Sequence, residues 1–168
     1  MEHVRISGII LAAGKGSRMK PLTERIPKSM AEFEGKTLLE HNLDPLVDLV
    51  DEFVIVINWL GDTIQDFVGN SYKGIPVTYA FQQNPKGGTL DSFRTGVKLA
   101  SDSSKGFIVA NSDNVLGPKM YTSLSGGIQN NPNSLYAVAK RIEDREELKQ
   151  YGIFQVNEKS ELIGISVT

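Results

Sequence analysis

Apolar runs alternate along the chain with segments in which apolar residues recur at helical spacing. The runs are typical of buried strands and predict strands over residues 5–11, 52–58, 75–81, 106–111, 134–141 and 151–156. The spaced segments are typical of amphipathic helices and predict helices over residues 37–50, 61–68, 88–100 and 118–129. Pro45 lies inside the first of these helices. Because proline lacks a backbone N–H group, we expect it to kink or divide that helix.

Strands and helices follow one another in turn, which predicts a mainly parallel sheet with helices on both faces. We therefore expect an α/β fold in three layers, an α/β/α sandwich. The length of 168 residues is that of one domain, so we expect a single domain over residues 1–168.

Three segments of unusual composition follow predicted strands. A glycine-rich, basic segment at residues 12–28 follows the first strand, residues 82–89 follow the third, and residues 112–114 follow the fourth. In open sheets of this class, ligands bind beyond the carboxyl ends of the strands. We therefore expect the three segments to converge on one binding site.

Composition excludes several kinds of protein. The formal net charge of −2 argues against a nucleic-acid partner bound through a broad basic face. The absence of cysteine excludes disulfides and thiolate metal sites. The sequence contains no run of about 18 apolar residues, the length that would predict a transmembrane helix. The apolar stretch near the N-terminus is too short for a signal peptide. We therefore expect a cytoplasmic protein without a membrane partner.

The sequence LAAGKGSRMKPLTERIPK at residues 11–28 combines glycines with basic residues, as expected of a polyphosphate site. A Walker loop requires G-x-x-x-x-G-K-[ST], but here Lys15 is followed by Gly16. A Rossmann fingerprint requires a third small residue and an immediate helix, but Met19 occupies that position and Pro21 follows soon after. Neither motif describes the segment.

The same segment resembles the signature of the sugar-1-phosphate nucleotidylyltransferases, G-x-G-[TS]-R-[LM]-x-P-[LM]-T-x-x-x-P-K, and matches it from Gly14 to Lys28. The resemblance continues in residues 83–89 (QNPKGGT), 111–113 (NSD) and 151–152 (YG), and so extends over most of the chain. It implies a Rossmann-like nucleotidyltransferase fold. It also implies an enzyme that moves a nucleotide from a nucleoside triphosphate to a hexose-1-phosphate, releasing pyrophosphate and forming a nucleoside diphosphate sugar.

The resemblance implies roles for individual residues. Arg18 would fork onto the β- and γ-phosphates, Lys28 would reach the reacting phosphate, and Asp113 would hold Mg²⁺ together with phosphate oxygens and water. The implied nucleotide-binding residues are Leu11, Ala12, Ala13, Gly14, Gly16, Ser17, Gln83, Gly88 and Thr89. Asn111 and Gly152 are the implied contacts of the sugar.

These residues also have plainer interpretations. Arg18 and Lys28 could be solvated charges on a loop, and Gln83 an ordinary surface residue. Asp113 could serve only as a cap of the following helix, because Ser, Asp and Asn are favoured at that position. The joint match of the two basic residues to a long, spaced motif favours the functional interpretation.

The resemblance stops near the C-terminus. In the family, a lysine that contacts the sugar phosphate and a second metal-binding aspartate follow the segment that resembles residues 151–165, whereas this sequence reads GISVT and ends. We therefore expect a domain that is short at this end. A non-catalytic nucleotide-binding or regulatory domain, a part of a split enzyme, and a relative that transfers to phosphocholine stay open as alternatives. The base, the sugar and association into a homo-oligomer also stay open.

Overall fold

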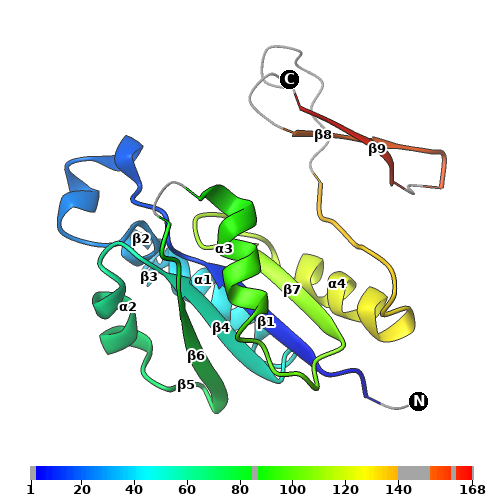
Figure 1. The fold of residues 1–168 in the computed structure, drawn as a ribbon, viewed down its shortest axis with the longest axis horizontal. Helices are drawn as coiled ribbons and strands as arrows, with labels where there is room; N and C mark the ends of the chain where they lie inside the picture. The colour runs from blue at the N-terminus through cyan, green and yellow to red at the C-terminus, as the bar shows by residue number, and fades with distance from the viewer. Residues whose placement is uncertain (1–2, 85–86, 140–151, 160–161, 168) are drawn as a thin grey trace. The chain divides into compact units, whose positions relative to one another are not determined.

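The computed structural model describes residues 3–84, 87–139, 152–159 and 162–167 (Figure 1). Their contacts form two compact units, Met1–Tyr136 and Ala137–Thr168, which are treated separately. The strands of the first unit are β1 (Ile6–Leu11), β2 (Glu32–Phe33), β3 (Lys36–Thr37), β4 (Glu52–Ile57), β5 (Ser71–Tyr72), β6 (Ile75–Phe81) and β7 (Gly106–Asn111). Its helices are α1 (Leu38–Leu43), α2 (Gly61–Val68), α3 (Gly88–Val97) and α4 (Pro118–Asn130).

The central sheet has five strands in the order β5-β6-β4-β1-β7. The pairs β1–β4, β1–β7 and β4–β6 are parallel, and only the short β5 pairs antiparallel with its neighbour. In β1, which lies between β4 and β7, Ile9 is opposite Val54 on one side and Val109 on the other. The predicted mainly parallel sheet is confirmed.

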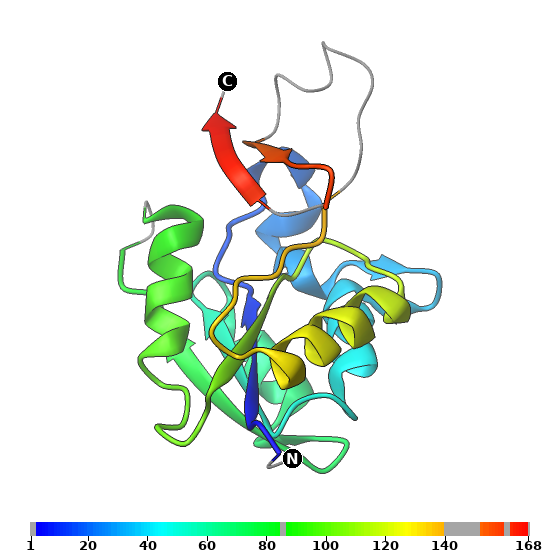
Figure 2. The ribbon, with the colours of Figure 1, turned by 90° about the vertical axis from the view of Figure 1, so that its right-hand side faces the viewer.

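Helices cover both faces of this sheet, so the predicted three layers are also confirmed. Figure 2 shows α3 (green) and α4 (yellow) on opposite sides of the strands. Side chains alternate between the two faces along each strand. Ile9 and Val54 therefore pack against Phe93 of α3, whereas Ile10 and Ile55 belong to the larger core on the other face.

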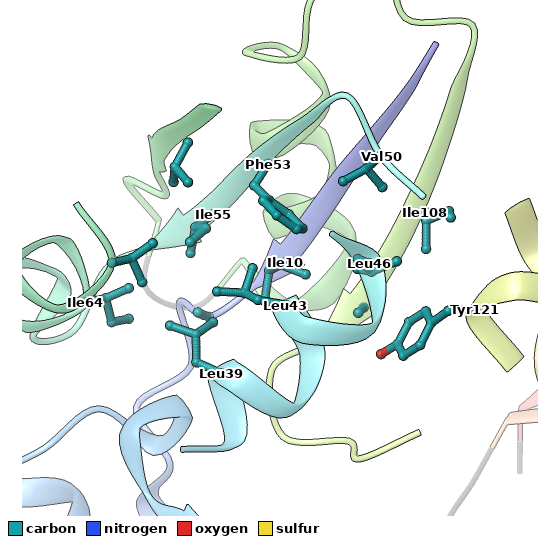
Figure 3. Close-up of a cluster of buried hydrophobic side chains, with 14 of the residues drawn as sticks. Ile10, Leu39, Leu43, Leu46, Val50, Phe53, Ile55, Ile64, Ile108 and Tyr121 are labelled. Carbon is teal, nitrogen blue, oxygen red and sulfur yellow. The ribbon is translucent and has the colours of Figure 1, made fainter. Parts of the chain in front are cut away.

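The larger core lies between the sheet and α1, α2 and α4. Figure 3 shows side chains of α1 and the turn after it directed toward those of the sheet. Fully buried members of this cluster include Ile10, Leu39, Leu43, Leu46, Phe53, Ile55 and Ile64. This packing holds the strands, and with them the loops that leave their carboxyl ends.

The helix predicted over residues 37–50 is divided, as expected from Pro45. A capping box begins α1: the Thr37 hydroxyl accepts a hydrogen bond from the Glu40 backbone N–H at 3.1 Å, and the Glu40 carboxylate accepts one from the Thr37 N–H at 2.8 Å. The α-helix ends at Leu43, and a 3₁₀ turn continues over Asp44–Leu46.

The strand predicted over residues 134–141 is wrong for its described part, because residues 134–139 contain no strand. Residues 140 and 141 lie outside the described residues. In the second unit, β8 (Gly152–Val156) and β9 (Leu162–Val167) form an antiparallel hairpin. Sequence reasoning predicted a strand at the position of β8 and missed β9. Within the described ranges, no helix has the length and apolar character needed to span a membrane.

Candidate active site

A cavity of about 350 Å³ opens beyond the carboxyl ends of β1, β6 and β7. Its wall is built by the three segments that were expected to converge. The lining residues are Leu11, Ala13, Gly14, Gly16, Ser17, Arg18, Met19, Lys28, Gln82, Gly88, Thr89, Ser92, Asn111, Ser112 and Asp113. The volume falls within the range of small-molecule sites.

The glycine loop that follows β1 has a defined conformation at Gly16. Its φ is 61°, in the left-handed region that favours glycine. The Gly16 carbonyl accepts hydrogen bonds from the Thr23 hydroxyl and from the Met19 N–H, both at 2.8 Å. A Cβ at Gly16 would lie 2.8 Å from Thr23 Cγ2 and 3.0 Å from Lys28 Cβ. The two ends of the loop therefore meet closely at a residue that has no side chain.

Trp59 supports this loop from outside the cavity. Its indole Nε1 donates a hydrogen bond to the Thr23 carbonyl at 3.1 Å. The Lys15 ammonium lies 5.3 Å from the centre of the indole ring, within reach of a cation–π interaction. Sequence reasoning assigned Trp59 no role, because an aromatic residue that follows a strand more often serves only in packing. Its contact with the glycine loop forms only in the folded chain.

The three predicted catalytic residues lie in the same cavity. Arg18 stands in the 3₁₀ turn Ser17–Met19, and Asp113 follows the end of β7. The Lys28 ammonium lies 2.5 Å from Asp113 Oδ2, and the two side chains are 31% and 37% exposed. Two cations and one carboxylate thus line a small, partly exposed space.

Another part of the wall is formed by Gln82, which follows β6, and by three residues of α3, Gly88, Thr89 and Ser92. Gln82 is 4% exposed, and its Oε1 accepts a hydrogen bond from the Ser92 hydroxyl. Sequence reasoning selected Gln83 instead, which is exposed and does not line the cavity. The alternation of side chains along β6 could have identified Gln82. Ala80 is buried, and a residue two positions further along points to the same side of the sheet.

Two other predicted contacts are not among the residues that line the cavity. Ala12 is buried and donates its backbone N–H to the Val56 carbonyl at 2.9 Å. Gly152 belongs to β8 in the second unit. In contrast, Leu11, Ala13, Gly14, Gly16, Ser17, Gly88, Thr89 and Asn111 all line the cavity. Their functional roles stay predictions.

The described residues contain no group of three or more His, Cys, Asp or Glu side chains that could bind a metal. A single carboxylate, Asp113, reaches the cavity beside Asn111 and Ser112. This donor set fits Mg²⁺, which is often bound by one or two carboxylates with substrate phosphates and water.

Comparison with known proteins agrees with the fold and the motif. The sequence profile of the nucleotidyl transferase family matches residues 7–166. The UTP–glucose-1-phosphate uridylyltransferase AglF of Haloferax volcanii is 30% identical over 158 residues, which cover 94% of this chain and 63% of that protein. The bifunctional protein GlmU of Methanocaldococcus jannaschii is 26% identical over 94% of this chain and 35% of that protein. The chain therefore spans less than two thirds of either relative.

Solved structures show the same architecture. A UDP-glucose pyrophosphorylase in complex with UDP-glucose superposes with a TM-score of 0.79 at 20% identity, covering 95% of this chain and 65% of that one. A putative glucose-1-phosphate thymidylyltransferase from Bacillus anthracis gives a TM-score of 0.75 at 20% identity, covering 96% and 64%. These similarities establish the Rossmann-like nucleotidyltransferase fold. With a family profile that matches almost its whole length, the chain belongs to the nucleotidyl transferase family.

Proposed function

We propose that the chain transfers a nucleoside monophosphate from a nucleoside triphosphate to a hexose-1-phosphate. One observation carries this proposal: Arg18 and Lys28 of the segment after β1 line the same cavity as Asp113, which follows β7. Phosphoryl chemistry of this kind needs mainly positioning and neutralisation of charge. A wall with two cations and one carboxylate is suited to both.

In the proposed reaction, an oxygen of the sugar phosphate attacks the α-phosphorus of the triphosphate. A new P–O bond forms, and the bond from the α-phosphorus to the bridging oxygen of the β-phosphate breaks. Pyrophosphate leaves with the electron pair of that bond, and a nucleoside diphosphate sugar is the second product. Because no net oxidation or reduction occurs, no redox cofactor is required.

The side chains divide this work. Arg18 can donate two parallel hydrogen bonds to oxygens of the leaving pyrophosphate. Lys28 places a compact charge near the α-phosphate, and its ion pair with Asp113 at 2.5 Å fixes the ammonium in the absence of ligand. Gly14 and Gly16 let backbone N–H groups approach phosphate oxygens without an intervening Cβ.

Asp113 is the residue that would hold Mg²⁺, with the triphosphate and water supplying the other oxygens. When bound, such an ion neutralises charge on the phosphates. On this proposal, Lys28 exchanges its ion pair with Asp113 for contact with the reacting phosphate as the substrates enter.

The acceptor is the less constrained partner. Asn111 lines the cavity at the end of β7 and can contact the sugar phosphate from that side. Gly152 remains a candidate for the sugar side on sequence grounds alone. The similarity to a UTP–glucose-1-phosphate uridylyltransferase favours a hexose-1-phosphate over phosphocholine.

The test is pyrophosphate release with Mg²⁺, in a grid that crosses five nucleoside triphosphates with several sugar-1-phosphates and phosphocholine. Asp113→Asn is run beside the wild type. Release with one pair, abolished in Asp113→Asn, is the expected result and names both substrates. Triphosphate binding without release under any pairing would overturn transfer and favour a binding domain or one part of a split enzyme.

A further inference from the structure

The side-chain amide of Gln82 is held in one orientation by the protein. Its Nε2 lies 2.9 Å from the Asn84 carbonyl oxygen. A carbonyl oxygen can only accept a hydrogen bond, so the group facing it must be the amide NH₂. This contact distinguishes the two ends of the amide, which are otherwise assigned only from their hydrogen-bond partners.

Ser92 fixes the other end. Its hydroxyl contacts Gln82 Oε1, which can only accept, so the hydroxyl donates. The alternative acceptor for this hydroxyl is the Gly88 carbonyl at 3.2 Å. If the hydroxyl donated there and the amide turned over, Oε1 would face the Asn84 carbonyl, acceptor against acceptor. The two contacts therefore support the same orientation.

The backbone of Gln82 is also held. Its N–H donates to the Ile57 carbonyl at 3.0 Å, and its carbonyl accepts from Asn58 Nδ2 at 2.6 Å. Gln82 and Ser92 are 4% and 7% exposed, and both line the cavity. With Oε1 engaged by Ser92 and one Nε2 hydrogen by Asn84, the second Nε2 hydrogen is left for a ligand. This part of the wall therefore offers a hydrogen-bond donor.

The two basic residues that line the cavity, Arg18 and Lys28, come from the segment between β1 and β2, whereas Gln82 and Ser92 are uncharged. We therefore expect a bound nucleotide to place its phosphates at the basic residues and its base toward Gln82. Uracil, thymine and guanine present a carbonyl oxygen where cytosine and adenine present an amino group. A donor held in place satisfies the first group and opposes the second, because two donors cannot pair.

We propose that Ser92 is a positioning residue that holds Gln82 as a hydrogen-bond donor, so that the site prefers bases with a carbonyl acceptor. The inference rests on the proposed function in that the cavity binds a nucleoside triphosphate. It does not depend on turnover.

The experiment measures dissociation constants by calorimetry for the full chain with Mg²⁺ and no acceptor. Two comparisons are made, UTP with CTP and GTP with ATP. The two bases of each pair have the same ring size, but the first has a carbonyl group where the second has an amino group. We expect UTP to bind at least about 10-fold more tightly than CTP, and GTP more tightly than ATP by a similar factor, the usual effect of one buried hydrogen bond that is made or opposed. Equal affinity within both pairs would overturn the proposal.

Three variants test the role of Ser92. In Ser92→Ala the Oε1 end of the amide loses its hydrogen bond, and only the Asn84 carbonyl still holds the Nε2 end. The amide is then less firmly oriented, so the ratio within each pair should fall to within about threefold. Ser92→Thr keeps the hydroxyl and should keep the wild-type ratio. Thr95→Ala is the matched control, because its hydroxyl is also on α3 but donates to the Asp91 carbonyl at 2.8 Å, away from the cavity.

An unchanged ratio in folded Ser92→Ala would overturn the role of Ser92. If the chain bound triphosphates with the expected base preference but released no pyrophosphate, this inference would be supported and the proposed transfer would be overturned. Absence of binding by all the triphosphates would overturn both.

Discussion

The Lys28 ammonium and the Asp113 carboxylate lie 2.5 Å apart although 85 residues separate them in the sequence. The glycine loop brings the lysine, and the end of β7 brings the aspartate. Because both side chains are about one third exposed, water screens their attraction. The pair is therefore expected to matter more for catalysis than for folding.

This expectation can be measured with Lys28→Met and Asp113→Asn. Each substitution should change the free energy of unfolding by less than about 1 kcal/mol, as for other exposed ion pairs, while turnover falls by at least about 100-fold. Urea denaturation and pyrophosphate release provide the two readouts. Glu24→Gln, which removes the exposed pair with Lys20 at 3.2 Å, is the control and should alter neither quantity. A large loss of stability with normal turnover would assign the Lys28–Asp113 pair a structural role.

Arg18→Ala should lower turnover by about two to three orders of magnitude, the usual loss for one preorganised donor at a developing charge. Arg18→Lys keeps the charge but loses the planar fork, so it should recover only part of the rate. Steady-state pyrophosphate release measures both variants. Unchanged turnover in Arg18→Ala would remove this residue from the proposed mechanism.

Gly16 and Gly14 form a matched pair of loop glycines. Gly16→Ala should destabilise the protein by about 1–2 kcal/mol, because the left-handed φ of 61° disfavours a Cβ and Thr23 and Lys28 stand in its way. Gly14→Ala meets no atom within 4 Å and should unfold like the wild type. Thermal and urea unfolding compare them. Equal stabilities would contradict the tight closure of the loop at Gly16.

Ser29 carries a buried hydroxyl that has no hydrogen-bond partner, the one such side-chain atom among the described residues. It is 1% exposed. Ser29→Ala removes an unsatisfied polar group and should raise the free energy of unfolding by about 1 kcal/mol. Ser7→Ala is the contrasting control: the Ser7 hydroxyl bonds Glu52 and Ser104, both at 2.6 Å, so its loss should destabilise by a similar amount. A less stable Ser29→Ala would indicate that the hydroxyl has a partner in solution.

Asp44 is expected to make the free energy of unfolding depend on pH. Burial alone would raise the pKa of this carboxyl, but hydrogen bonds from Lys36, Lys73 and Tyr72 outweigh it and lower the pKa to about 2, against an ordinary value of 3.8. The folded protein thus binds the Asp44 proton less tightly than the unfolded chain. The resulting stabilisation is complete above about pH 4 and is lost as the pH falls through 2.

Asp44→Asn should therefore cost on the order of 1 kcal/mol at pH 5, and its difference from the wild type should shrink as the pH approaches 2. Urea unfolding over this range measures the difference. Asp48→Asn removes an exposed carboxylate four positions along the chain and serves as control. A constant difference across the range would mean that the ionised carboxylate of Asp44 is not stabilised by folding.

Much of the fold follows from sequence periodicity. The bounds of α2, β6 and β7 agree with the predicted ranges. In each of these segments the apolar residues keep a single spacing, and turn residues mark both ends. The two-residue strands are too short to show a period. Residues 134–139 were misassigned because a short apolar run is not always part of a sheet, and here the run has no strand partner.

The candidate site was predicted in part for similar reasons. Arg18, Lys28 and Asp113 follow from a spaced motif and from the rule on strand ends, and the structure brings them together. Gln82 and Ser92 were missed because their contact joins a strand end to a helix ten positions later and has no local signature. A shift of one residue, from Gln82 to Gln83, was enough to choose an exposed side chain over a buried one.

Trp59 is the single tryptophan of the chain, and its indole touches the glycine loop through Thr23 and Lys15. The protein thus carries an intrinsic fluorophore beside its glycine loop, with no second indole to contribute background. Any ligand that moves this loop or withdraws Lys15 from the ring changes the environment of the Trp59 indole and therefore its fluorescence. The loop can therefore be followed optically, in real time and without a label.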